Sequence, residues 1–150
     1  MTAIQMAGAA LLMFQSAAPA KKPVTAPPQK TASTDVAVTV TYKGKGPVDG
    51  GHKVIVFAFP DSNITSSSRP LDTQFASKNG ETVTFKNVAS PVYVFAVYDD
   101  KGTYDGVSGP PPAGIPSATY RKMPKGAPTA VASGSPAIKF AFDDSERWSK

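Results

Sequence analysis

The residues of this sequence best suited to chemistry are acidic side chains that follow apolar segments. Asp99, Asp100 and Asp105 lie in a glycine-punctuated loop directly after the apolar segment 92–98. Carboxylates and main-chain carbonyls are the oxygen ligands that calcium prefers. The spacing is not that of an EF-hand loop, because Pro110 stands where a bidentate glutamate would be needed.

A second acidic pair, Asp143 and Asp144, follows the last apolar segment of the chain. If seven strands alternate in direction, the first, third, fifth and seventh end at the same pole, which brings this pair to the acidic loop. The sequence therefore predicts a pole that could hold calcium, formed by Asp99, Asp100, Asp105, Asp143 and Asp144. Lys43 and Lys45 reach the same pole, so the alternative is a set of solvated ion pairs that each add little stability.

Three aromatic residues in predicted loops or tails are candidates for contact with a ligand or partner: Tyr104, Tyr120 and Trp148. Exposed rings could stack on sugars or anchor a partner chain. The alternative is that these rings plug the ends of the fold. For Trp148, beside Arg147, packing is favoured over recognition.

Catalytic signatures are weak. His52 is the single histidine and there is no cysteine, so a thiol nucleophile and disulfides are excluded. The stretch GVSG at 106–109 is one residue short of a nucleophile elbow. Asp99 and Asp100 are adjacent loop residues, unlike the opposed carboxylates of glycosidases. We therefore expect no enzyme, with a small hydrolase as the least favoured alternative.

A formal charge of +5 alone would suggest a nucleic-acid or membrane partner. The distribution of the charged residues along the chain argues against it. Three of the sixteen basic residues precede Asp35, whereas all eleven acidic residues lie from Asp35 onward. Residues 35–150 therefore carry thirteen basic and eleven acidic side chains, a formal charge of only +2. Without a basic stripe, the sequence favours no nucleic-acid partner.

The N-terminus is typical of an exported protein. Residues 1–20 contain a short apolar run followed by small residues, as in a signal peptide, and the run is too short to span a membrane. Cleavage is expected after Ala20 or, as a competing site, after Ala18. The usual positive charge before the run is missing, so either the signal begins upstream or the targeting interpretation is wrong. Residues 21–34, rich in proline and lysine, are expected to be a disordered linker.

The elements that must position these side chains are strands. Alternating apolar residues or short apolar runs, separated by turn residues, predict seven strands in residues 35–150 and no helix. The expected strands are 36–42, 52–59, 71–77, 82–86, 92–98, 129–132 and 137–142. The sequence therefore predicts an all-β, seven-stranded antiparallel β-sandwich of the immunoglobulin-like kind, formed by one domain.

Strands 52–59 and 92–98 are apolar on both faces, which places them centrally, with a second apolar face covered by a loop or a partner. Self-association through that face is one possibility. Residues 107–128 contain six prolines, which exclude a helix or a central strand there. We expect this segment to be a long ordered crossover that carries Tyr120 and Met123 over the sandwich.

The stretch GETVTFKNVASPVYVFAVYDDKG, residues 80–102, resembles the strand-loop-strand core of carboxypeptidase-regulatory-like or transthyretin-like domains. In those domains F-x-N-V precedes a short turn and a strand with an early tyrosine. The chain is also similar to secreted bacterial families of uncharacterised function. Here Ala89-Ser90-Pro91 replaces the usual proline-glycine turn. The resemblance implies a non-catalytic accessory or adhesive module.

These observations predict a periplasmic or extracellular protein that acts as a binding or structural module of the cell envelope. Its partner would be an envelope protein or a glycan, reached through the loop pole or the second apolar face. The alternative from another class is a calcium-dependent carbohydrate-binding domain.

Overall fold

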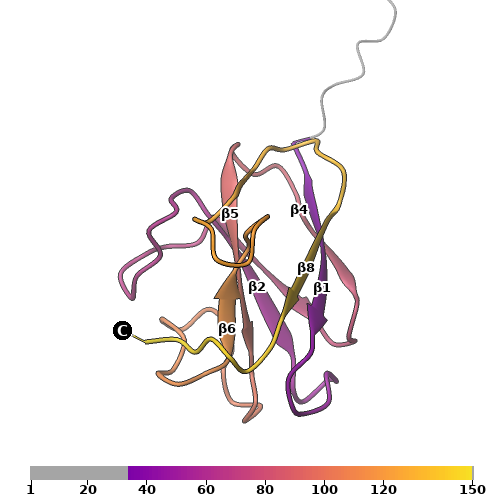
Figure 1. The fold of residues 1–150 in the computed structure, drawn as a ribbon, viewed down its shortest axis with the longest axis vertical. Coiled ribbons are helices and arrows are strands. Elements are labelled where there is room, and N and C mark those ends of the chain that lie inside the picture. The colour runs from indigo at the N-terminus through magenta and orange to yellow at the C-terminus, as the bar shows by residue number, and fades with distance from the viewer. Residues whose placement is uncertain (1–33, 150) are drawn as a thin grey trace, which may run out of the picture. The chain divides into compact units, whose positions relative to one another are not determined.

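The computed structural model describes residues 34–149, and all regular structure in this part of the chain is β (Figure 1). Eight strands form two sheets. Their bounds are β1 Val36–Tyr42, β2 Val54–Phe59, β3 Asp72–Ala76, β4 Thr82–Phe85, β5 Val92–Tyr98, β6 Ser117–Thr119, β7 Ala130–Val131 and β8 Ile138–Phe142. The predicted all-β class is confirmed, and the seven expected strands all have a counterpart.

The smaller sheet has the order β4-β1-β8 and is mixed. β1 runs antiparallel to β4 but parallel to β8, with Val38 opposite Ile138 and Tyr42 opposite Phe142. The prediction of a fully antiparallel sandwich is therefore wrong for this sheet. Alternation of apolar residues determines which face of a strand is buried, but it does not determine the neighbouring strand or its direction.

The larger sheet has the order β3-β2-β5-β6, with β7 paired to the beginning of β5, and all its pairs are antiparallel. Every residue of β2 is buried, and β5 is buried except at Tyr93. Both strands lie at the centre of the sheet, as their two apolar faces predict.

The main core lies between the two sheets. Alternate residues of β1 point into it, including Val36, Val38 and Val40, and they meet the inward faces of β2 and β5. Phe85, Phe140 and Phe142 complete the core from the outer strands of the smaller sheet. The outward face of β2 and β5 carries a second apolar cluster that consists of Ile55, Phe57, Phe59, Phe95, Val97, Ile115 and Trp148.

The second apolar face is covered by the chain itself. Ile64, Tyr104, Ile115 and Trp148 pack on it from loops and from the C-terminal segment. The sequence left open whether a loop or a partner covers this face, and the structure places loops there.

The proline-rich segment 107–128 is more regular than expected, because it contains the short strand β6 against β5. Pro116 precedes this strand, and its carbonyl accepts a hydrogen bond from the Tyr98 N–H at 2.9 Å. Proline can occupy such a position because it has no N–H to donate but keeps its carbonyl.

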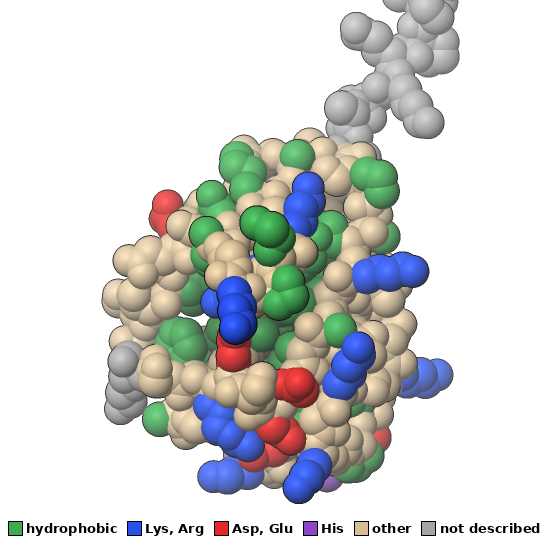
Figure 2. Space-filling model, viewed as in Figure 1, with side chains coloured by type: hydrophobic (Ala, Val, Ile, Leu, Met, Phe, Trp, Pro, Cys, Tyr) green, Lys and Arg blue, Asp and Glu red, His purple; other side chains and the backbone are tan. Residues whose placement is uncertain are grey.

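On the face shown in Figure 2, lysine and arginine side chains are scattered and acidic side chains lie among them, without a continuous basic stripe. Within residues 34–149 there is no helix that could cross a membrane. The predicted signal peptide and nearly all of the predicted linker lie outside the described residues.

Candidate functional site

The ends of β1, β5 and β8 meet at one pole of the sandwich. The rings of Tyr42 and Tyr98 stack there with centroids 3.9 Å apart. The Lys43 N–H donates a 2.8 Å hydrogen bond to the Phe142 carbonyl, which joins the ends of β1 and β8. Strand direction therefore brings the two predicted acidic groups, 99–105 and 143–144, toward the same end of the molecule.

Asp144 fastens the loop after β1 to the end of β8. Its carboxylate accepts hydrogen bonds from the Lys45 N–H, at 2.9 Å, and from the Tyr42 hydroxyl. These two bonds hold the pKa of Asp144 below its usual value. Burial, and then the bond to Asp144, raise the pKa of Tyr42. The Asp144 carboxylate is therefore committed to holding the main chain.

Asp99 has a similar role in the loop after β5. It is only 5% exposed, and its carboxylate accepts hydrogen bonds from the N–H groups of Thr103, at 3.2 Å, and Tyr104, at 3.0 Å. Gly102 turns the chain between them with φ of 65°, in the left-handed region that favours glycine. Asp99 thus closes the loop on itself and sets the position of Tyr104.

Two further predicted acidic residues hold tight turns. The Asp105 carboxylate accepts hydrogen bonds from the Ser108 hydroxyl and from the N–H groups of Val107 and Ser108, and these lower its pKa to about 2. Asp143 accepts a 2.8 Å hydrogen bond from the Ser145 N–H. Bonds from Ser145 hold the pKa of Asp143 below its usual value. Both are turns in which a side chain replaces a main-chain acceptor.

The structure does not assemble these carboxylates into a metal centre. Among residues 34–149, no group of three or more histidine, cysteine or acidic side chains is placed so that it could hold a metal ion. Asp100 is exposed, and its side chain has no hydrogen bond within the described part of the chain. Asp99, Asp105 and Asp143 each hold their own turn, and Asp144 holds the loop after β1.

The lysines predicted to pair with these carboxylates do not do so. The two ion pairs within residues 34–149 are Asp49 with His52 and Arg121 with Glu146. Lys45 contacts Asp144 through its main-chain N–H rather than its ammonium group. No contact ion pair joins Lys43 or Lys45 to these carboxylates within residues 34–149, but the charges of Lys43 and Lys45 help to lower the pKa values of Asp143 and Asp144.

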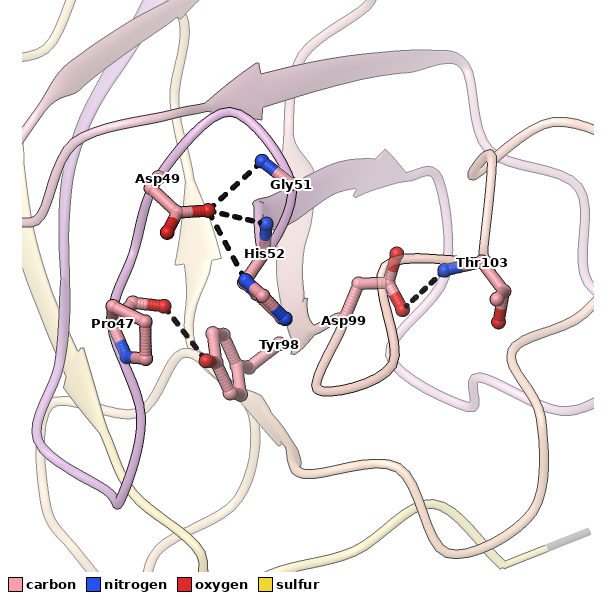
Figure 3. Close-up of polar contacts among 7 residues, drawn as sticks. All are labelled: Pro47, Asp49, Gly51, His52, Tyr98, Asp99 and Thr103. Carbon is pink, nitrogen blue, oxygen red and sulfur yellow. Dashed lines mark hydrogen bonds and ion pairs between the residues drawn. The ribbon is translucent and has the colours of Figure 1, made fainter.

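His52 lies in the loop between β1 and β2, near the same pole (Figure 3). The Asp49 carboxylate lies 3.2 Å from its Nδ1 and accepts hydrogen bonds from the N–H groups of Gly51 and His52. These N–H groups hold the pKa of Asp49 below its usual value. Of the hydrogen bonds formed by residues 34–149, none joins His52 to a serine hydroxyl. Tyr98 donates at 2.7 Å to the Pro47 carbonyl beside this turn.

A cavity lies over the second apolar face, and the turn held by Asp105 forms part of its wall. We call it the aromatic pocket. Its volume is about 550 Å³, within the range of small-molecule sites. It lies over Phe57, Phe59 and Phe95 and is enclosed by loop 64–70, loop 104–111 and Trp148.

The floor of the aromatic pocket is a set of interlocking rings. Phe57 and Phe95 lie 6.0 Å apart between centroids, Tyr104 lies 6.5 Å from Phe57, and Trp148 lies 5.3 Å from Phe95. Such tilted ring pairs are favourable contacts beyond their buried area. Two of the three predicted aromatic contact residues, Tyr104 and Trp148, therefore come together here.

Tyr104 is held at the rim of the pocket from both ends. Its N–H is bound by Asp99, and its hydroxyl donates a 2.8 Å hydrogen bond to the Gly109 carbonyl. Burial, with a smaller effect of Asp105, raises the pKa of this hydroxyl to about 12. The acidic loop predicted to bind calcium thus contributes to the pocket by fixing an aromatic side chain.

Trp148 is pinned by main-chain bonds between the C-terminal segment and residues 114–116. Its N–H donates to the Ile115 carbonyl, and its carbonyl accepts from the Gly114 N–H, each at 2.8 Å. The side chain is 8% exposed, and its indole Nε1 has no hydrogen-bond partner among the described residues. The predicted packing of Trp148 is confirmed, and its buried indole N–H has no partner among the described residues.

Tyr120, the third predicted aromatic residue, lies elsewhere. It packs at the edge of the main core, edge-on to Phe140 with ring centroids 5.8 Å apart. It also lines a smaller recess between β6 and β8, of about 270 Å³. Its surroundings are those of a ring that closes the open side of the sandwich.

Sequence reasoning did not single out the serine-rich wall of the aromatic pocket, Thr65 to Arg69. A run of small polar residues is typical of any surface loop, so nothing in its composition points to a site. No protein-family model matches the chain, and comparisons with curated proteins and with solved structures find no significant match.

Proposed function

We propose that this chain is an exported, non-catalytic binding module of the cell envelope and that its ligand occupies the aromatic pocket. The observation that carries the proposal is the pocket itself, which has a volume of about 550 Å³, an aromatic floor and a hydroxyl-rich wall. Ligand sites commonly combine an apolar floor with a few polar groups that orient the ligand.

The hydrogen bonds around the pocket also support a binding role. Thr65, Ser67 and Ser68 bond to one another, and Ser68 Oγ accepts from the Thr65 N–H at 2.9 Å. On the opposite wall, Asp99 and Gly109 hold Tyr104. A site with walls held in advance loses little entropy when a ligand enters.

The export and the envelope partner rest on the N-terminal sequence. The relationship to carboxypeptidase-regulatory-like or transthyretin-like domains, and the immunoglobulin-like topology, stay predictions that accompany the proposal. An accessory module of that kind would act by binding, without chemical turnover.

Co-sedimentation tests the proposal. The full chain is mixed with isolated bacterial sacculi and with insoluble envelope polysaccharide, and the bound fraction is measured. The variant Ser66→Phe fills the pocket from an exposed position whose hydroxyl has no hydrogen bond within the described chain. Ser77→Phe, at an exposed serine outside the pocket, is the matched control.

We expect the wild type and Ser77→Phe to sediment with one of these materials and Ser66→Phe to remain in solution. If the wild type binds neither material, or if Ser66→Phe binds as well as the control, the proposal is wrong.

A further inference from the structure

The charged lining of the aromatic pocket is one-sided. Arg69 is its single charged lining residue, and no acidic residue lines it. Arg69 is exposed and makes no hydrogen bond or ion pair within residues 34–149. The Ser66 and Thr73 hydroxyls are also without hydrogen bonds in that part of the chain.

Trp148 also lines the pocket, but its indole Nε1 is buried and not accessible from it. The groups that can meet an occupant are therefore the guanidinium of Arg69 and the unpaired hydroxyls of Ser66 and Thr73. Together, they favour a polar occupant that carries a negative charge near Arg69.

The apolar part of the pocket restricts the occupant further. Tyr104 is half-buried and presents ring surface, Phe57 and Trp148 contribute buried rings at 3% and 8% exposure, and Pro110 and Pro111 add apolar surface. A purely anionic solute would leave this surface without contacts, and a purely apolar one would leave Arg69 and Ser66 facing it without partners. The pocket volume accommodates one or two rings of a small ligand.

We infer that the aromatic pocket binds a sugar residue that carries a carboxylate, as in a uronic-acid glycan. The sugar's C–H face lies against the ring of Tyr104, its hydroxyls accept from Ser66 and Thr73, and its carboxylate pairs with Arg69. A planar guanidinium can bind a carboxylate through two parallel N–H bonds. This inference rests on the proposed function and names the ligand class of the same site.

Intrinsic fluorescence can follow binding directly, because Trp148 is the single tryptophan of the sequence and lines the pocket. The full chain is titrated with trigalacturonic acid and, as a matched neutral probe, with its trimethyl ester. We expect the acid to change the Trp148 emission saturably and to bind at least about tenfold more tightly than the ester, since the ester has no charge for Arg69.

Substitutions of Arg69 test whether its positive charge binds the carboxylate of the ligand. Arg69→Gln should weaken binding of the acid by about tenfold and leave binding of the ester unchanged, whereas Arg69→Lys should have an intermediate affinity because it keeps the charge but loses the planar fork. Lys122→Gln, an exposed cation outside the pocket, is the control and should bind like the wild type. Thermal melts verify that each variant is folded.

Equal affinity for acid and ester, no effect of Arg69→Gln, or no binding of either probe would overturn the inference. These outcomes are separate from a failure of the proposed function. If sedimentation depends on Ser66 while trigalacturonic acid does not bind, the module binds another envelope ligand and only the ligand class assigned here is wrong.

Discussion

Replacement of Asp99 by alanine tests how the loop after β5 is held. The side chain is 5% exposed and accepts from the N–H groups of Thr103 and Tyr104 at 3.2 and 3.0 Å. Asp99→Ala leaves both donors without this acceptor in a partly buried loop. It also releases the main chain of Tyr104 at the rim of the aromatic pocket.

The expected size follows from these two bonds. A hydrogen bond to a charged group contributes about 1.5–3 kcal/mol, and two bonds to one carboxylate are not fully additive, so the loss should be about 2–4 kcal/mol. For a folded unit of this size, each kcal/mol lowers the melting temperature by about 4 °C. The melting temperature of Asp99→Ala should therefore fall by roughly 8–16 °C.

Thermal and urea unfolding of the full chain, followed by circular dichroism, measure this loss. Asp99→Asn keeps one carbonyl acceptor without the charge and should lose about half as much stability. Asp100→Ala is the matched control, because the neighbouring side chain is exposed and has no hydrogen bond within the described residues. If Asp99→Ala and Asp100→Ala have the same small effect, the Asp99 carboxylate does not hold the loop.

Three further predictions concern the same end of the molecule. Gly46→Ala should cost more than about 1 kcal/mol, because φ is 125° and the added Cβ would lie 2.5 Å from the Tyr98 hydroxyl; Gly50→Ala, with open space around it, should be nearly neutral in urea unfolding. The folded-state pKa of Asp105, about 2, lies below the usual 3.8, so its carboxylate stabilises the fold above pH 3.8 and this stabilisation is lost as the pH falls toward 2. The difference in melting temperature between the wild type and Asp105→Asn should therefore shrink over that interval, and a constant difference would contradict the assignment. Calcium and EDTA should leave the wild-type melting temperature unchanged, whereas a rise with calcium that Asp99→Ala abolishes would support the calcium alternative.

Strands with a clear apolar pattern could be predicted from the sequence. Val36, Val38 and Val40 alternate with alanine and threonine and are buried as expected, and β2 and β5 occupy the central positions that their two apolar faces indicate. These strands are defined by which side chains they bury, and buried positions are visible in the sequence as a regular spacing of apolar residues.

Features that depend on neighbours across space could not be predicted. The parallel pairing of β1 with β8 leaves no local pattern, and β6 has three residues, too few to show an alternation beside Pro116. The carboxylates illustrate the same limit in the site. Their approach to one pole follows from strand direction, but whether they face an ion or their own main chain depends on turn geometry that the residue types do not specify.

The aromatic pocket was predictable in part. Tyr104 and Trp148 are large aromatic residues outside the strands, and that composition is a usable signal. Ser66 and Arg69 carry no such signal, because serines and a single arginine are ordinary in an exposed loop. Their significance comes from facing aromatic rings that lie on other segments of the chain.

The parallel pair of β1 and β8 also has a consequence for how the protein is made. The first and the last of the described strands are neighbours, so the smaller sheet cannot be completed on the ribosome until β8 has emerged. Contacts between distant parts of a chain also form slowly. The smaller sheet is therefore the late-forming part of the sandwich, because it joins the two ends of the described chain.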